Sequence, residues 1–340
     1  MKTPRDVEGN LETEEQLVGP GGGSLAPGGA PAPDSPKQVV GRSPWEIFWR
    51  QFKRDRWAFA GIFVVAIMIL LAIAAPLFAK IVHHGPNDVN LRALDSFGLP
   101  SGPSKAYWFG ADETGRDLFV RVVYGARTSL VIAIFATGMA LVIGVILGMA
   151  AGFYRGKIDT LISRTTDVVL SLPILLLALG LASACGASKE GCLGGLIRPG
   201  LLLVSLIIGL FSWPYIARII RGQVLSLREK EFVEASRSLG SSNFRIIMRE
   251  ILPNVAAPII VFTTLIIPSN ILFEAGLSFL GVGVPDSTPS WGAMLSDAGS
   301  KFTYAAWLMI FPGLALFMTT LAFNLVGDGL RDALDPRTST

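Results

Sequence analysis

The residues of this sequence that could do chemistry do not form a hydrolytic motif. A phosphate-binding loop needs a glycine-rich turn, whose backbone amides surround the phosphates, followed by Lys and then Ser or Thr. Gly156-Lys157 is the nearest candidate, but Ala151 stands where the first glycine belongs and Ile158 where the hydroxyl belongs. Neither G-x-S-x-G nor H-E-x-x-H occurs. We therefore expect no catalytic residue and no cofactor bound by this chain.

Two adjacent histidines, His83 and His84, are the side chains most like metal ligands. Zinc sites usually combine three or four ligands drawn from Cys, His, Asp and Glu. Two neighbouring histidines without a nearby cysteine seldom form such a site, so we expect a solvated loop here and no bound metal.

The elements that would position these residues are membrane-spanning helices. The chain has 340 residues, of which 51% are hydrophobic and only 16% charged, which is too apolar for an ordinary soluble domain. A soluble protein would have to bury six charge-free stretches, and a membrane β-barrel would need short alternating segments instead. Each stretch reaches the roughly 17–25 residues that a helix needs to cross a bilayer, so we expect an all-α polytopic membrane protein with six transmembrane helices. The stretches are Trp57–Ala79, Ser129–Phe153, Val168–Ala184, Leu201–Ala217, Val255–Phe273 and Ala305–Val326.

The basic residues indicate the orientation of these helices. Arg50, Lys53 and Arg54 precede the first stretch, and Lys and Arg are also concentrated between the second and third stretches and between the fourth and fifth. Cytoplasmic loops carry an excess of such residues, so both termini of this multi-pass protein of the cytoplasmic (inner) membrane are expected in the cytoplasm. The formal net charge of +3 is too small to suggest a nucleic-acid partner.

Both cysteines, Cys185 and Cys192, fall in the outer loop between the third and fourth spans under this orientation. Disulfides persist in that oxidising compartment, and a loop this short can close. A disulfide between them is one hypothesis, and two free thiols are the alternative.

Residues 1–42 are rich in Gly, Pro, Ala and acidic residues, and they cannot bury enough apolar surface to offset the entropy of ordering. They also lack the basic start and apolar core of a cleaved signal peptide, so we expect a disordered cytoplasmic tail.

Residues 43–80 combine a short amphipathic helix with the first span. Ser43 and Pro44 suit a helix start, and aromatic residues follow on one face with basic residues off it. This pattern predicts a helix lying in the membrane interface, although a cytoplasmic extension of the first span would look similar. The aromatic face comprises Trp45, Phe48, Trp49 and Phe52.

The second span carries a small residue at every fourth position, namely Ala140, Gly144, Gly148 and Gly152. Small residues on one face let another helix backbone approach closely, which is how helices associate in lipid. This row is predicted to be a helix-packing seam.

Polar side chains gather on or near the fifth span. Because polar groups facing lipid are costly, they should face a pore or another helix, and hydrogen bonds between packed helices are the alternative to a pore. The pore candidates are Thr263, Thr264, Ser269, Asn270 and Glu274.

Between the fourth and fifth spans the pattern predicts two short helices separated by a glycine. Residues 229–239 read as an amphipathic helix, and Gly240 suits the left-handed residue that ends it. Ser241 or Ser242 can cap a second amphipathic helix, and residues 252–254 are expected to end it before the fifth span. Such a helix–glycine–helix would form a rigid cytoplasmic knob attached to two spans.

The knob resembles the EAA motif of binding-protein-dependent ABC importer permeases, in the run Glu234-Ala235-Ser236, Gly240 and Ile251-Leu252-Pro253. Ser236 stands where that family usually has alanine, and Glu250 where it usually has isoleucine. The resemblance implies that this coupling helix docks on an ATPase subunit. The implied docking residues are Glu234, Ala235, Ser236, Gly240, Leu252 and Pro253.

Further segments resemble the C-type permease of the dipeptide, oligopeptide and nickel group, and together they span about residues 43–337. Residues 108–117 (WFGADETGRD) are similar to the LGTDELGRD segment of that group. The remaining matches are residues 124–130 (YGARTSL), 274–281 (EAGLSFLG), 289–292 (PSWG) and 324–332 (NLVGDGLRD).

This resemblance implies the type I importer permease fold, with a peripheral first helix and a five-helix core. The core would cover residues 127–328, with coupling helices at 229–253, after an extracytoplasmic segment at 81–126 and before a cytoplasmic tail at 329–340. The implied partners are a second, non-identical permease, two ATPase subunits that bind ATP and Mg, an extracytoplasmic substrate-binding protein and membrane lipid.

Three classes of function remain open on the sequence. The resemblance implies import of di- or oligopeptides, and the same type of importer for nickel or a small solute such as glutathione is the alternative. A stand-alone channel or secondary transporter should show inverted repeats or charges at mid-membrane, and neither is visible. A membrane-bound enzyme lacks any catalytic constellation.

Overall fold

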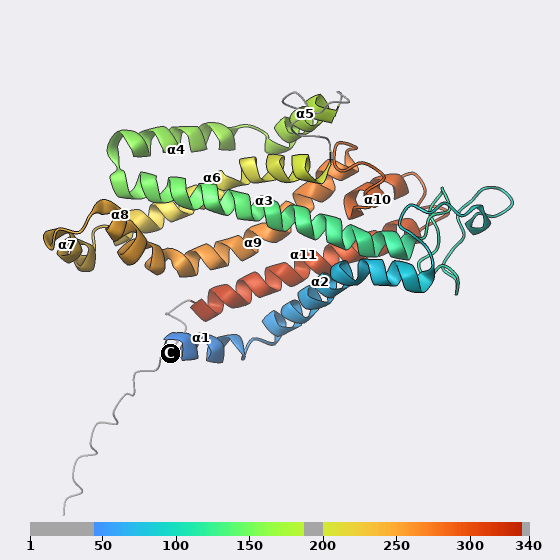
Figure 1. Cartoon of the computed structure of the whole chain (residues 1–340), viewed down its shortest axis with the longest axis horizontal. Coiled ribbons are helices and arrows are strands. Elements are labelled where there is room, and N and C mark those ends of the chain that lie inside the picture. Colours follow the sequence, from blue (N-terminus) through green and yellow to red (C-terminus); the bar gives the residue numbers. More distant parts are fainter. Residues whose placement is uncertain (1–43, 187–199, 335–340) are drawn as a thin grey trace, which may run out of the picture. The chain divides into compact units, whose positions relative to one another are not determined.

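A computed structural model describes residues 44–186 and 200–334, and the part it describes is built from helices (Figure 1). Within these residues five helices are long and apolar enough to cross a membrane, and a bent pair would make a sixth span. The expected all-α polytopic fold is therefore confirmed. The five are α2 (Arg56–Val82), α3 (Leu118–Tyr154), α6 (Leu201–Leu227), α9 (Leu252–Phe279) and α11 (Trp307–Leu334).

The third expected span, Val168–Ala184, is broken rather than continuous. It covers the end of α4 (Gly156–Ser171), a break at Leu172 and Pro173, and most of α5 (Ile174–Gly186), and the two helices meet at 82°. Proline lacks the backbone donor and disfavours helical geometry in the residue before it, and Leu172 is accordingly extended, with φ −80° and ψ 140°.

Shorter elements lie at the two ends of the long helices. α1 (Pro44–Phe52) packs Phe52, which is buried, together with Phe48 against Ala333 of α11, so its aromatic face contacts protein as well as solvent. The side chain of Trp45 lies outside the described residues. The other short elements are η1 (Leu91–Ala93), α7 (Glu231–Ser238), α8 (Asn243–Arg245), η2 (Ile246–Ile251) and α10 (Trp291–Ala298).

The row of small residues on α3 faces α6, and the two helices lie side by side (Figure 1). A Cβ atom added to Gly144 would come within 2.6 Å of Cβ of Ile216, and one added to Gly148 within 2.6 Å of the carbonyl oxygen of Ala217. Ala140 and Gly152 are buried in the same seam. Glycine is therefore required where the two backbones approach most closely.

α6 lies centrally and α2 peripherally within the described helices. Of the most apolar window in each, 67% is buried for α6 but only 11% for α2. α2 packs mainly on α11, where a Cβ atom on Gly329 would come 2.3 Å from Cβ of Ala58. The first span is thus attached to the outside of the other helices, as expected.

Two helix ends differ from the expected domain limits. α3 begins at Leu118, before the expected core start at residue 127, because the Asp117 side chain caps it by accepting a hydrogen bond from the backbone N–H of Val120. α11 continues through residue 328 to Leu334. The proposed tail at residues 1–42, and residues 335–340 of the expected C-terminal tail, lie outside the described residues.

Candidate functional site

The helix–glycine–helix at residues 229–251, here called the knob, lies at one end of α6 and α9 (Figure 1). α7 ends in a Schellman motif: the backbone N–H of Ser241 donates to the carbonyl of Ser236 at 3.1 Å, and that of Gly240 to the carbonyl of Arg237 at 3.0 Å. Gly240 has φ +80°, the left-handed conformation that favours glycine. Ser242 then caps α8 by accepting a hydrogen bond from Arg245.

The second helix of the knob does not end before the fifth span, contrary to the expectation for residues 252–254. It continues through a π turn at Ile246–Ile251 into α9, giving one helix of 37 residues from Asn243 to Phe279. Pro253 is accommodated at the start of α9, and the Asn254 side chain donates to the carbonyl of Glu250 at 2.6 Å. The second helix of the knob and the fifth span are therefore one continuous helix.

The knob has one buried face and one exposed face. Val233, Ile246 and Ile251 are fully buried and pack on Val224 of α6. On the other face Leu239 is 87% exposed and Phe244 is 71% exposed. We call this face the docking patch; it also includes Phe232 and Met248. Large apolar side chains gathered on a polar surface mark a protein-binding site.

The implied docking residues lie on the knob and at the start of α9. Glu234, Ala235 and Gly240 are exposed, and Ser236 is half-buried. Pro253 is exposed and Leu252 half-buried at the start of α9. Sequence periodicity identified the apolar stripes of both knob helices, but it did not separate exposed Leu239 and Phe244 from buried Ile251.

Sequence reasoning missed a set of polar contacts at this end of the helices, in which one ion pair reaches the knob itself and two others join α4 to α6. Arg155, in the turn between α3 and α4, contacts Glu229 at 2.5 Å. Next to it, Arg228 donates to the carbonyl of Phe153 and stacks on that ring. Along the α4–α6 contact the Arg221 guanidinium makes a two-point pair with Asp159 at 2.5 and 2.9 Å. A second pair, Arg218–Asp167, lies nearby at 2.7 Å.

The five pore candidates separate into two groups. Asn270 is buried between three helices, donating to Thr137 of α3 at 2.8 Å and accepting from Ser212 of α6 at 3.0 Å. Glu274 is fully buried and accepts hydrogen bonds from Ser129 and Ser278. These two residues join helices within the chain.

The three other pore candidates are less buried. Thr263 and Thr264 are half-buried, and their hydroxyls donate to carbonyls of their own helix, while Ser269 is exposed. Their role as pore residues stays a prediction.

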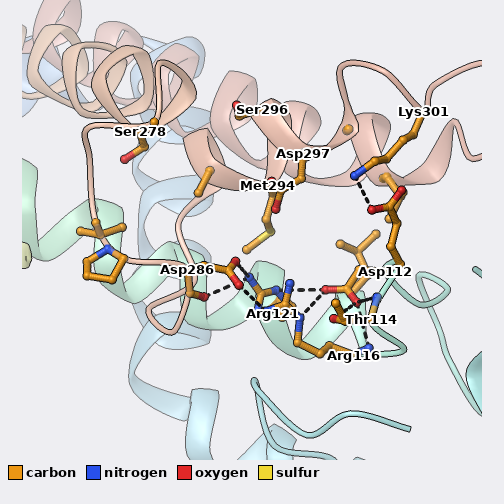
Figure 2. A pocket seen from close by; sticks show the side chains of 18 residues that line it. Asp112, Thr114, Arg116, Arg121, Ser278, Asp286, Met294, Ser296, Asp297 and Lys301 are labelled. Carbon is orange, nitrogen blue, oxygen red and sulfur yellow. Dashed lines mark hydrogen bonds and ion pairs between the residues drawn. The ribbon is translucent and has the colours of Figure 1, made fainter. Parts of the chain in front are cut away.

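At the other end of the long helices lies a cavity of about 430 Å³, here called the outer pocket. Figure 2 shows its walls, formed by residues 112–118 and 281–286, α10 and the start of α3. Arg116 contacts Asp112 at 2.6 Å and Asp286 at 2.8 Å, and Arg121 contacts the same carboxylates at 3.7 and 3.2 Å. Hydrogen bonding from Arg116 holds the pKa of Asp286 below its ordinary value.

The segment at residues 108–117 forms the turn that presents Arg116. Oδ1 of Asp112 accepts from the backbone N–H groups of Thr114 and Arg116, each at 2.9 Å. Gly115 has φ +79°, and a Cβ atom there would come 2.3 Å from the carbonyl oxygen of Asn90. Asp112 and Gly115 therefore fix the shape of the turn. The turn in turn places the charged side chain of Arg116 at the pocket.

The adjacent histidines lie at the end of α2 and in the turn after it. His83 ends α2 with a left-handed backbone, and Nδ1 of His84 lies 3.0 Å from Oδ2 of Asp117 while its ring stacks on Tyr107. Among the described residues, no group of three or more His, Cys, Asp or Glu side chains could hold a metal ion. Cys185 is buried at the end of α5, but Cys192 lies outside the described residues, so the disulfide stays a prediction.

Known proteins include relatives that align with this chain over nearly their whole length. The chain is 41% identical over 310 residues to the dipeptide transport system permease protein DppC of Alkalihalophilus pseudofirmus, covering 90% of this chain and 95% of the relative. It is also 41% identical over 302 residues to the glutathione transport system permease protein GsiD of Escherichia coli O6:K15:H31, covering 89% and 93%.

A solved structure shares the fold. The inward-facing MetNI methionine ABC transporter contains a chain that matches with a TM-score of 0.51 at 19% identity, covering 64% of this chain and 98% of that one.

Two family models match different parts of the chain. Residues 43–99 match the N-terminal transmembrane domain of oligopeptide transport permease C. Residues 144–340 match the binding-protein-dependent transport system inner membrane component. The chain therefore belongs to the family of binding-protein-dependent inner membrane transport components, the permeases of ABC importers.

Proposed function

We propose that this chain is the C-type permease of an ABC importer for di- or oligopeptides, working with a second, non-identical permease. The relative named as a dipeptide permease supports this substrate class. Relatives named as glutathione permeases are equally similar, and glutathione is itself a small peptide. Import of glutathione is therefore the second candidate.

The observation that carries the proposal is the docking patch on the knob. Leu239 and Phe244 are large apolar side chains exposed to solvent in the isolated chain, and such residues favour contact with a partner. They lie on either side of the turn that Gly240 makes between the two knob helices. Because the knob continues into α9, movement of a bound ATPase would be carried into the membrane. The ATPase subunits would bind ATP and Mg and perform the hydrolysis.

The charge of this end supports its cytoplasmic placement. Arg155, Arg218, Arg221 and Arg228 lie at the knob end of the helices, where the positive-inside rule expects basic residues. The outer pocket would then face the compartment of the substrate-binding protein, and both termini would lie in the cytoplasm.

The test is ATP-driven uptake by the complete complex in proteoliposomes. The tagged chain is purified with its partners, and uptake of labelled L-alanyl-L-alanine and of labelled glutathione is measured with the binding protein outside. We expect uptake of at least one that requires enclosed ATP. Purification of the chain without any ATPase, or uptake independent of ATP, would overturn the proposal.

A further inference from the structure

The outer pocket has the size and lining of a small-molecule site. Its volume of about 430 Å³ falls within the range of roughly 300–1,000 Å³ typical of ligand pockets. Charged side chains line one side, and Leu118, Val284, Met294 and Leu308 supply apolar surface. Both a charged group and an apolar side chain of a ligand could therefore be accommodated.

The cations that line the pocket are already engaged. Arg116 and Arg121 each pair with both Asp112 and Asp286 (Figure 2). The ammonium group of Lys301 pairs with Glu113 at 2.5 Å. Arg121 is further occupied by hydrogen bonds to the carbonyl of Pro86 and the side chain of Asn87.

Asp297 carries the negative charge that these pairs leave over. It projects from α10 into the pocket and is exposed there, and it makes no hydrogen bond or ion pair with any residue that the structure describes (Figure 2). The pocket contains four carboxylates, Asp112, Glu113, Asp286 and Asp297, against three cations, which leaves a net charge of −1. Although Asp297 is open to the pocket, the surrounding protein displaces part of its hydration and so raises its pKa above the ordinary value, and the nearby charge of Asp286 adds to this effect.

We propose that the outer pocket binds a small solute through an ammonium group, which Asp297 holds while apolar parts of the solute lie against Val284, Met294 and Leu308. A cation placed beside Asp297 would neutralise the surplus charge and offset its repulsion from Asp286. Since the described residues offer no group of three carboxylate, Cys or His ligands for a metal, an organic ammonium fits better than a metal ion. The identification of this ammonium as the α-amino group of a short peptide rests on the proposed function.

The test measures binding to the importer complex in lipid nanodiscs, without ATP and without the substrate-binding protein. Saturation-transfer NMR titrates L-alanyl-L-alanine, and separately its N-acetylated form, which keeps the carboxylate but has no ammonium group. We expect saturable binding of the free dipeptide, weakened about fivefold by N-acetylation, because an ion pair between partly exposed groups contributes about 1 kcal/mol.

Two variants test whether the dipeptide binds in the outer pocket, one within the pocket and one outside it. Asp297→Asn removes the charge without removing any hydrogen bond of the protein, and should weaken the free dipeptide to the level of the acetylated one. Asp88→Asn is the control, since Asp88 lies outside the pocket and an asparagine can still accept the hydrogen bond from Gly85; it should bind normally.

Absence of saturable binding to the wild-type complex, equal binding of the acetylated dipeptide, or normal binding by Asp297→Asn would each overturn the inference. Any of these results combined with ATP-driven peptide uptake would leave the proposed function standing. Binding of a plain amine such as propylammonium by an importer that takes up no peptide would support the ammonium site and overturn its peptide assignment.

Discussion

The close approach of α3 and α6 leads to a prediction about the stability of the folded chain. Two glycines on α3 can be compared, because one is crowded by α6 and the other has open space around it. A Cβ atom on Gly148 would meet the backbone carbonyl oxygen of Ala217 at 2.6 Å and Cβ of Ile220 at 2.9 Å. A Cβ atom on Gly138, on the same helix, would meet nothing within 4 Å. Gly148→Ala and Gly138→Ala therefore make the same chemical change with and without a steric cost.

The expected difference in the free energy of unfolding follows from two opposing effects. Replacing glycine by alanine within a helix stabilises it by about 1 kcal/mol at either position. At Gly148 the added methyl group must also push α6 away, since a backbone atom cannot rotate aside, and overpacking typically costs about 1–3 kcal/mol. Gly148→Ala should therefore be less stable than Gly138→Ala by roughly 1–3 kcal/mol.

The assay compares the two variants and the wild type by reversible unfolding in mixed detergent micelles and by melting temperature. Gly138→Ala should match or exceed the wild type, whereas Gly148→Ala should fall below Gly138→Ala. Equal stability of the two variants would show that the glycine row is not required for the approach of α3 and α6, and would refute the reasoning.

Three further predictions concern the knob, the buried amide and the outer pocket. Leu239→Ser combined with Phe244→Ser should remove the ATPase from the purified complex without lowering the melting temperature, whereas Val233→Ala on the buried face should lower it; retention of the ATPase by the double variant would contradict a docking role for the patch. Asn270→Leu removes the amide that joins three helices and should cost about 0.6–1.7 kcal/mol in the same unfolding assay, and an unchanged stability would show that its hydrogen bonds are replaced locally. Asp297→Asn should raise the melting temperature at pH 7, because a carboxyl whose pKa is raised by folding destabilises the fold while ionised. The difference from wild type should begin to shrink as the pH falls through that raised pKa and vanish below the ordinary pKa of an aspartate, and a difference that grows in acid would contradict it.

Features set by local sequence could be predicted, and those set by distant contacts could not. Gly240 and the glycine row on α3 depend on backbone geometry and helix periodicity, which are visible in the sequence. The break at Pro173 could have been predicted, because proline and the residue before it both disfavour a helix. The 82° angle between α4 and α5 depends instead on how α5 packs.

In the candidate site too, features set by local sequence could be predicted and features set by distant contacts could not. The apolar stripes of the knob could be identified, but which of their residues stay exposed depends on packing against α6. The outer pocket depends on Arg121 and Asp286, which are 165 residues apart, and a single sequence carries no signal that pairs them. The π turn that joins the knob to α9 was missed because Pro253 suggested a helix end, whereas the helix continues and Pro253 lies directly after the π turn.

The central claim is that the knob couples ATP hydrolysis to transport, and the number of peptides imported per ATP hydrolysed in proteoliposomes tests it most directly. Gly240→Pro forces the left-handed residue of the knob out of its conformation, and Glu234→Lys reverses a charge beside the docking patch. Gly98→Pro is the matched control, since Gly98 has φ +76° in the outer loop with open space around it. We predict that both knob variants lose transport per ATP at normal protein levels while the control keeps it; unchanged transport in both knob variants would contradict the coupling role.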